Sequence, residues 1–270
     1  MMKNKLFGQH IVTSTVPPVI KHHLLKDEPK KALVISFHGT TGIGKTYVAD
    51  MIAEYIYGSK DSIHAYTFMG EDFRDPRQIE SYKKTIKESV IRATRQCARS
   101  LFIFSEIESM QFGVLDVLTP YLDYQQHVDH VNYRKNIFLF LSNIGGHAIN
   151  NLTVENIQQG QPRESLSRTK LEALLSRNAL VSGGFEKNHL IISGLVDFFI
   201  PFLPLESFHV KQCVLEEVSM RVDDNGKERC GGVLLELVDK VAAEVAYDAG
   251  LSNLAVHGCK MIDKKVDMLI

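Results

Sequence analysis

The chain has 270 residues, of which 31 are lysine or arginine and 32 are aspartate or glutamate, and 44% of its residues are hydrophobic. This length can bury a substantial core in one large domain, with or without a small satellite, and ordinary glycine and proline contents argue against disorder and fibrous repeats. A formal charge of -1 without long basic or acidic blocks gives no indication of binding to nucleic acid or to an anionic membrane surface.

No segment of the sequence has the length and apolarity of a membrane-spanning helix. The longest apolar run, residues 190–205, contains a serine, an aspartate and two prolines, whereas a span needs about 20 mostly apolar residues. We therefore expect a buried segment there, which leaves only peripheral membrane association open. The first eight residues are not followed by an apolar stretch, so we expect no signal peptide in this chain, which is then either cytosolic or a version without its leader.

The predicted elements of the first 160 residues alternate between strands and helices. Residues 1–30 indicate a helical entry that carries Pro17-Pro18. Continuous apolar runs, typical of strands buried in a parallel sheet, lie at residues 32–37, 101–104 and 137–141. Helix-compatible sequence separates them, at residues 47–57, 77–99 and 112–123. The alternation predicts an α/β fold, with a central parallel sheet covered by helices on both faces.

From about residue 160 onward the sequence predicts helices and no convincing strand. The clearest helical spacings lie at residues 167–175 and 233–247. We therefore expect two domains, a large α/β domain over residues 1–198 and a small all-helical lid over residues 199–270.

The strongest motif is a glycine-rich loop between the first predicted strand and the helix that follows it. Residues 39–46 match G-x-x-x-x-G-K-[ST] in full and in the required context, which argues against a chance turn. The backbone N–H groups and the helix N-terminus would bind phosphate oxygens. Lys45 would then contact the β- and γ-phosphates of ATP, and the Thr46 hydroxyl would bind Mg²⁺. The candidate ATP-binding residues here are Gly39, Thr40, Thr41, Gly42, Ile43, Gly44, Lys45 and Thr46.

The second predicted strand ends in Ser105-Glu106. In enzymes with this loop, such a strand commonly ends in an aspartate near Mg²⁺ and a glutamate beside the attacking water. Glu106 is the candidate for the second role, with an exposed strand-end acid as the alternative. Ser105 carries no charge, although it could bind a metal-bound water. Since losing a carboxylate that supports a metal typically costs about 10–100-fold in affinity or activity, we expect weak Mg²⁺ binding, slow hydrolysis or both.

The third predicted strand ends in Ser142-Asn143. An amide at this position could orient the attacking water or contact the γ-phosphate. An asparagine after a strand is by itself more often a turn residue. The two preceding strand ends favour the functional interpretation of Asn143.

These segments together resemble the AAA+ ATPases of the Clp/HSP100 clade, and within that clade they closely resemble the torsins. The resemblance covers residues 8 to about 265. The carrying segments are residues 8–10, 31–46, 97–106, 120–124, 140–143, 201–206 and 258–260. It implies a P-loop AAA+ domain with a central parallel sheet flanked by helices, plus a small C-terminal α-helical lid domain.

The resemblance also implies roles for single residues. Lys45 and Thr46 match the Walker A positions, and Glu106 matches the Walker B glutamate. Asn143 matches sensor 1, and Lys260 matches the basic residue of sensor 2. Torsins usually carry asparagine or histidine at the last Walker A position, so Thr46 restores a metal-binding hydroxyl.

The four cysteines, Cys97, Cys213, Cys230 and Cys259, fit neither a disulfide-dense scaffold nor a zinc pattern. The resemblance implies that Cys213 and Cys259 form a redox-sensitive disulfide coupled to nucleotide binding. Two buried thiols are the alternative, because a reducing compartment would forbid the bond. Torsins reside in the lumen of the endoplasmic reticulum and nuclear envelope, so the resemblance implies that location, and a chain that natively starts here would be cytoplasmic.

The activity implied by the resemblance is chaperone-like remodelling of proteins or membranes, driven by ATP hydrolysis. Torsins assemble into oligomers and hydrolyse ATP only beside an activator, the luminal domain of lamina-associated polypeptide 1 or its homologue, which supplies an arginine. Within this chain, we expect Arg163, Arg168 and Arg177 to be solvated helix charges rather than such an arginine.

Two other interpretations stay open. Ser105 favours an ATP-binding, hydrolysis-poor interaction module that acts through nucleotide-dependent assembly. Free thiols at Cys213 and Cys259 would instead favour a cytosolic Clp-type unfoldase subunit.

Overall fold

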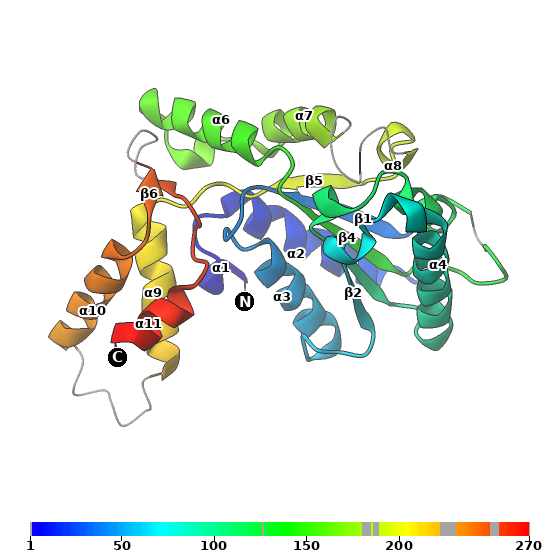
Figure 1. Cartoon of the computed structure of the whole chain (residues 1–270), viewed down its shortest axis with the longest axis horizontal. Coiled ribbons are helices and arrows are strands. Elements are labelled where there is room, and N and C mark those ends of the chain that lie inside the picture. Colours follow the sequence, from blue (N-terminus) through cyan, green and yellow to red (C-terminus); the bar gives the residue numbers. More distant parts are fainter. Residues whose placement is uncertain are drawn as a thin grey trace.

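The computed structural model describes residues 2–125, 127–179, 185, 189–221, 231–248 and 254–269. Cys230 lies outside these residues. A central sheet with helices on both faces is followed by a smaller, mainly helical C-terminal part (Figure 1). The predicted α/β fold is confirmed.

The central sheet consists of five parallel strands in the order β2-β3-β4-β1-β5. Their bounds are β1 (Leu33–His38), β2 (Ala65–Met69), β3 (Leu101–Ser105), β4 (Ile137–Ser142) and β5 (Phe198–Pro201). The α-helices before the C-terminal part are α1 (Met2–Lys5), α2 (His10–Leu25), α3 (Lys45–Tyr57), α4 (Ile79–Gln96), α5 (Thr119–Leu122), α6 (Gly146–Gln158), α7 (Arg168–Ala179) and α8 (His189–Ile192). Short 3₁₀ helices are η1 (Gly70–Phe73), η2 (Pro76–Gln78), η3 (Ile107–Ser109), η4 (Val114–Leu118) and η5 (Arg163–Ser165).

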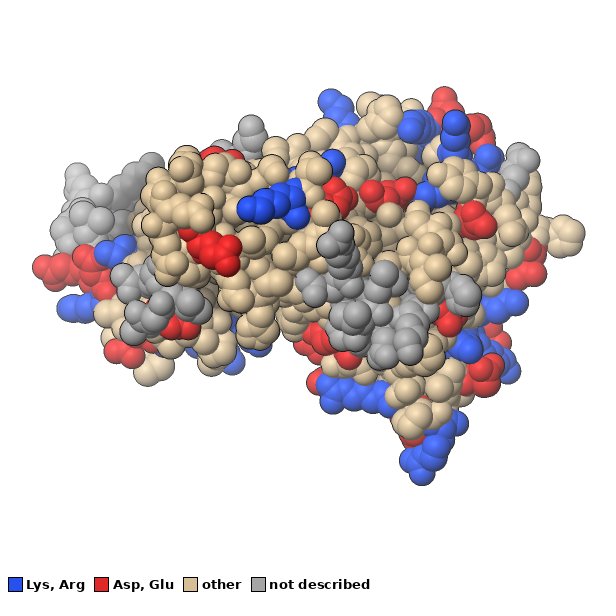
Figure 2. All heavy atoms as spheres, turned by 90° about the horizontal axis from the view of Figure 1, so that it is seen from above, with Lys and Arg blue, Asp and Glu red and all other residues tan. Residues whose placement is uncertain are grey.

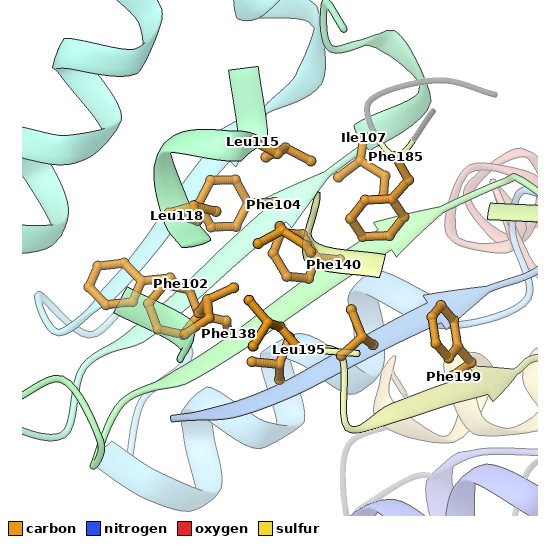
Figure 3. Packing of buried hydrophobic residues seen from close by; sticks show 14 of the residues in the cluster. Phe102, Phe104, Ile107, Leu115, Leu118, Phe138, Phe140, Phe185, Leu195 and Phe199 are labelled. Atoms are coloured by element: carbon orange, nitrogen blue, oxygen red, sulfur yellow. The ribbon is translucent and has the colours of Figure 1, made fainter. Parts of the chain in front are cut away.

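The two faces of the sheet bury different side chains, because alternate residues of a strand point to opposite faces. On one face the rings of Phe102 and Phe138 stack with centroids 4.8 Å apart, and those of Phe104 and Phe140 with centroids 5.2 Å apart (Figure 3). Phe185 packs against this aromatic ladder, whose cluster also includes buried residues of α4, η4 and α7. The opposite face of the strands is mainly aliphatic and belongs to a second cluster with residues of α2 and α3.

The register of the sheet brings the functional loops together. Ser105 at the end of β3 lies opposite Leu141 of β4, and Ser142 of β4 lies opposite His38 of β1. The loops after these three central strands therefore leave the sheet at one edge.

The sequence did not predict the two outer strands of the sheet, β2 and β5. No strand was expected after residue 160, and this is wrong, since β5 pairs with β1. β5 has only four residues and ends in Pro201, and β2 is partly exposed, so neither shows the long apolar run of a central strand. The predicted domain boundary between residues 198 and 199 stays a prediction, although β5 crosses it.

The C-terminal part is mainly, but not entirely, helical. Its elements are α9 (Ser207–Arg221), α10 (Gly231–Ala243), β6 (Tyr247–Asp248), β7 (Leu254–Ala255) and α11 (Ile262–Leu269). The helix expected over residues 233–247 ends earlier, because Tyr247 and Asp248 pair with β7 in an antiparallel ribbon. The expectation of an all-helical lid is corrected in this detail.

On the face that carries α6 and α7, basic and acidic side chains of the described residues are interspersed rather than gathered by sign (Figure 2). Within the described ranges, no helix is long and apolar enough to cross a membrane.

Candidate nucleotide-binding site

A cavity of about 600 Å³ lies at the carboxyl ends of β3 and β4, where the C-terminal part meets the glycine-rich loop. This volume is within the range of small-molecule sites, roughly 300–1,000 Å³. Its lining comes from residues 5–7, 41–47, 105–106, 108, 141–143, 205, 213, 216–217, 259–260 and 262–263. The fold thus brings segments from the whole length of the chain to one site.

The glycine-rich loop has the backbone shape that its motif predicts. Gly42 and Gly44 have φ values of 80° and 103°, a region that glycine adopts at little cost. α3 starts at Lys45, so the N–H groups of its first turn have no partners within the helix. Loop and helix end together form a set of donors suited to phosphate oxygens.

The Lys45 ammonium points back over this loop. It donates to the carbonyl oxygens of Gly39 and Thr40, at 2.6 and 2.7 Å, and to Asn143 Oδ1 at 2.9 Å. Burial lowers the pKa of Lys45 to about 8, while the charges of Glu108 and then Glu106 oppose this shift. These three oxygens accept the hydrogen bonds of the Lys45 ammonium. Phosphate oxygens of a bound nucleotide could replace them as acceptors.

Glu106 lines the cavity at the end of β3, next to the buried Ser105. Its backbone has φ 55° and ψ 45°, a left-handed conformation that costs a non-glycine residue of order 1–3 kcal/mol. The Glu106 carbonyl would lie 2.0 Å from a Cβ atom added at Gly70, so the chain turns tightly against η1. Such strain in a cavity-lining acid supports a functional role for Glu106.

Glu108, which the sequence analysis did not single out, lines the same cavity from η3. Its Oε2 accepts from Ser142 Oγ and the Asn143 backbone N–H at 3.0 and 3.2 Å, and its Oε1 accepts from Asn143 Nδ2 at 2.6 Å. Asn143 therefore bridges Glu108 and Lys45, with its amide nitrogen toward the carboxylate and its oxygen toward the ammonium. The sequence feature that could have identified Glu108 is a second acidic residue, two residues after Glu106.

His38 joins the end of β1 to the loop after β4. It is fully buried, with Nδ1 at 3.0 Å from the Ile144 carbonyl and Nε2 at 2.7 Å from Ser36 Oγ. Burial lowers the pKa of His38 to about 4, so the ring is neutral. A neutral ring satisfies both contacts when Nδ1–H donates to Ile144 and Nε2 accepts from the Ser36 hydroxyl.

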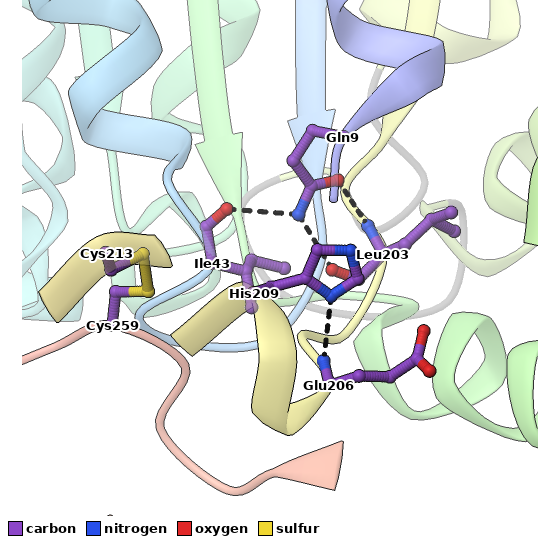
Figure 4. The surroundings of a disulfide bond; sticks show 7 residues. All are labelled: Gln9, Ile43, Leu203, Glu206, His209, Cys213 and Cys259. Carbon is purple, nitrogen blue, oxygen red and sulfur yellow. Dashed lines mark hydrogen bonds between the residues drawn. A yellow bond between two sulfur atoms is a disulfide. The ribbon is translucent and has the colours of Figure 1, made fainter. Parts of the chain in front are cut away.

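Gln9 ties the glycine-rich loop to the segment between β5 and α9. Its Nε2 donates to the carbonyls of Ile43 and Leu203, at 3.2 and 2.8 Å, and its Oε1 accepts from the Leu203 N–H at 2.8 Å (Figure 4). Only 2% of Gln9 is exposed, so these bonds are shielded from water. The connection gives the N-terminal Gly-Gln-His segment a structural purpose.

Arg163 is not the solvated charge that was expected, since it is only 8% exposed. Its guanidinium donates to the carbonyls of Gly8 and Pro204, at 2.8 and 2.7 Å, and to Glu206 Oε1 at 3.2 Å. Arg168, half-buried, pairs with Glu172 at 3.4 Å. The Arg177 side chain lies outside the described part of the structure.

The predicted disulfide between Cys213 and Cys259 is confirmed (Figure 4). Both cysteines line the cavity, and the Cys259 N–H donates to the Gly42 carbonyl at 2.9 Å. A Cβ atom at Gly42 would lie 1.8 Å from the His257 carbonyl, so the C-terminal segment rests directly on the glycine-rich loop. Lys260, the next residue, also lines the cavity.

The structure brings the predicted site residues together. Residues 41–46, Ser105, Glu106, Asn143 and Lys260 line one cavity, while Gly39 and Thr40 contribute the carbonyls that accept from Lys45. Their individual roles stay predictions. Among the described residues, no cluster of three or more His, Cys, Asp or Glu side chains could hold a metal ion without another ligand.

Comparisons with known proteins agree with this arrangement. The model of the Torsin family matches residues 1–104. A Torsin-like protein of Drosophila melanogaster is 37% identical over 274 residues, which cover 100% of this chain and 79% of the relative. A Torsin-like protein of Caenorhabditis elegans is 35% identical over 272 residues, which cover 98% of this chain and 74% of the relative.

Solved structures show the same fold at low sequence identity. The closed state of Hsp104 with ATPγS and FITC casein superposes with a TM-score of 0.67 at 15% identity, covering 100% of this chain and 45% of that chain. The Saccharomyces cerevisiae Hsp104–ADP complex gives a TM-score of 0.66 at 14% identity, covering 100% and 44%. This chain thus spans less than half of the Hsp104 chains. Taken together, the relatives show that the chain belongs to the torsin family, and the solved structures show that it has the fold of the Hsp104 chains.

Proposed function

We propose that this chain binds ATP with Mg²⁺ and hydrolyses it to remodel proteins or membranes, as a chaperone-like AAA+ ATPase. The observation that carries the proposal is the convergence of Lys45, Glu106 and Asn143 on the cavity beside the glycine-rich loop. The Hsp104 structures of the same fold have ATPγS or ADP in their descriptions.

The residues present fit a nucleotide with its metal ion. The loop N–H groups and Lys45 would bind the β- and γ-phosphates, and the apolar wall of Leu6, Phe7 and Ile43 would take the base. When bound at the Thr46 hydroxyl, Mg²⁺ supplies positive charge to the phosphate oxygens. Glu106 would accept a proton from the attacking water, and Asn143 would hold that water or the γ-phosphate.

Lys260 and the disulfide connect this chemistry to the C-terminal part. Lys260 reaches the cavity one residue after the cysteine that bonds to Gly42. We assign it the sensor 2 role, in which a phosphate-dependent contact changes how the C-terminal part sits on the loop. Movement of that part is how the bound nucleotide would be communicated to a partner or to a neighbouring subunit.

We further assign the chain to the lumen of the endoplasmic reticulum and nuclear envelope. The support is the Cys213–Cys259 disulfide, because such bonds persist in oxidising compartments. Cytosolic unfolding activity would require the same cysteines to work as thiols.

Efficient hydrolysis would need an activator. The described lining of the cavity contains lysines but no arginine, and Arg163 is committed to a buried structural cluster. An arginine supplied by another chain can raise turnover by about 10³–10⁵-fold in related phosphoryl-transfer enzymes. A luminal domain resembling that of lamina-associated polypeptide 1, or another subunit of a homo- or hetero-oligomer, would supply it.

Ser105 favours a second candidate, an interaction module that binds ATP, assembles in response and hydrolyses little. β3 carries no carboxylate at Ser105, where hydrolytic relatives of this class need metal support. In this case ATP binding itself would cause the conformational change that drives assembly. Hydrolysis would only return the chain to its unassembled state.

The test is ATP binding and turnover of the purified chain with Mg²⁺, alone and with the luminal domain of the activator. Micromolar binding with turnover only beside the activator supports the ATPase, provided that Glu106→Gln abolishes turnover and keeps binding. Tight binding without turnover in either case supports the interaction module. Absence of ATP binding contradicts both proposals, because each depends on the loop at residues 39–46.

A further inference from the structure

The end of β3 lacks the charge that a metal-dependent phosphate site needs. Ser105 is 9% exposed and offers only a hydroxyl. Glu106, the neighbouring acid, is exposed and lines the cavity, where it can contact water. A divalent cation beside phosphates is usually held by one or two carboxylates, so a second acid is needed here.

Glu108 lies where that acid is needed. It lines the same cavity as Lys45 and Thr46, and three donors from the end of β4 hold its carboxylate in place. Two of these donors use Oε2 and only one uses Oε1. Because an ionised carboxylate has about four acceptor positions, one position on Oε1 remains for a water molecule.

The Glu108 carboxylate is linked to Lys45, at the phosphate end of the site. Asn143 connects the two residues, because its Oδ1 accepts from the Lys45 ammonium and its Nδ2 donates to Glu108 Oε1. The remaining charged groups that line the cavity lie on other segments and are Lys5, Glu216, Glu217, Lys260 and Asp263. Glu108 is therefore connected to Lys45 by hydrogen bonds through Asn143, at the ends of β3 and β4.

We infer that Glu108 replaces the carboxylate that β3 lacks at Ser105 and acts as a positioning residue, holding through water the Mg²⁺ that accompanies the nucleotide. The inference rests on the proposed nucleotide binding and names the residue that supports its metal. It predicts that the absence of an acid at Ser105 is compensated three residues later in the sequence, from the 3₁₀ helix η3 rather than from the strand.

The test separates metal support from a merely structural role. The affinity for ADP is measured in EDTA and across a Mg²⁺ titration, because ADP lacks the γ-phosphate that Asn143 is expected to contact. Glu108→Gln should raise the Mg²⁺ concentration needed for half-maximal strengthening of binding by about 10–100-fold. In EDTA the same variant should bind ADP as well as or better than the wild type, since a repelling charge has been removed.

Matched variants complete the experiment. Ser105→Asp in the Glu108→Gln background should restore most of the Mg²⁺ response, because the charge returns to the usual position. Glu155→Gln removes the same charge from an exposed position of α6 and should change nothing. Thermal melting checks that each variant is folded, and Ser105→Asp alone should lower the Mg²⁺ requirement if Glu108→Gln does not fold.

The outcomes distinguish the two proposals. An unchanged Mg²⁺ requirement in folded Glu108→Gln overturns the inference, as does an equal loss of ADP affinity with and without Mg²⁺, which would indicate a structural role only. If the wild type binds no nucleotide with or without Mg²⁺, the proposed function itself fails, whatever Glu108 does.

Discussion

The two walls of the nucleotide cavity are built differently. On the sheet side, Lys45, Asn143 and Glu108 form a continuous hydrogen-bonded chain, and buried His38 fastens the same loop to β1. On the C-terminal side, the Cys259 N–H donates to the Gly42 carbonyl, and the disulfide joins Cys259 to Cys213 of α9. The sheet side is suited to hold reacting groups still, and the C-terminal side is suited to move in response to nucleotide.

We expect the largest effect on activity from Glu106→Gln, on the sheet side of the cavity. Removing a general base costs about 10²–10⁴-fold in rate, so turnover beside an activator should fall by that factor while ATP affinity stays close to that of the wild type. Single-turnover hydrolysis and equilibrium binding measured on one preparation check both halves. A parallel loss of affinity would place Glu106 in binding rather than in chemistry.

Removal of the disulfide tests the C-terminal wall of the cavity. Replacing Cys213 and Cys259 together by serine should lower the free energy of unfolding by about 2–4 kcal/mol, with faster amide exchange in α9 and α11 than in the sheet. Denaturant unfolding and hydrogen exchange measure the two effects, and Cys97→Ser, at the free cysteine, is the control. Equal loosening of β3 and β4 would show that the walls are not independent.

Lys45→Ala removes the cation that the sheet side holds over the glycine-rich loop. Hydrogen bonds to charged groups contribute about 1.5–3 kcal/mol, so ATP binding should weaken by roughly 10–100-fold with little loss of stability. Titration of a fluorescent ATP analogue checks the affinity, and thermal melting checks the fold. Unchanged binding would remove the phosphate role from the loop.

The most gradual effect is the pH dependence that His38 adds to the stability of the sheet side. Its folded pKa of about 4 lies below the ordinary value of 6.5, so the unfolded chain binds the proton more readily between these values. The free energy of unfolding should therefore fall as pH drops from 6.5 toward 4, by at most about 1.4 kcal/mol per pH unit from this group.

His38→Asn sharpens that prediction, because its amide can still donate to Ile144 but cannot titrate. The variant should show a flatter loss of stability in acid, measured by denaturant unfolding between pH 4 and 7. His22→Asn, at an exposed position of α2, should keep the wild-type slope. Buried His209, whose pKa is lowered to about 3 by burial and by Arg163, and buried His23, whose pKa is lowered by burial, should contribute to the slope that remains in His38→Asn.

Contiguous patterns were enough to predict much of this molecule. The three central strands are mainly apolar because they are buried on both faces, and residues 39–46 hold their motif within one loop. The edge strands β2 and β5 were not predicted. An edge strand has a partner strand on one side only, so its sequence can be less apolar than that of a central strand. The Cys213–Cys259 pairing followed from the resemblance to torsins, and the structure contains it.

The sequence by itself therefore determined the sheet centre, the phosphate loop and the acid at the end of β3, since each is written in neighbouring residues. Only the tertiary structure decided that Glu108 holds Asn143 and that Arg163 is buried against Gly8, a residue 155 positions away. Contacts of this kind depend on which loops the parallel sheet brings to one edge. Local propensity carries no information about them, because the partners meet only after the strands have paired.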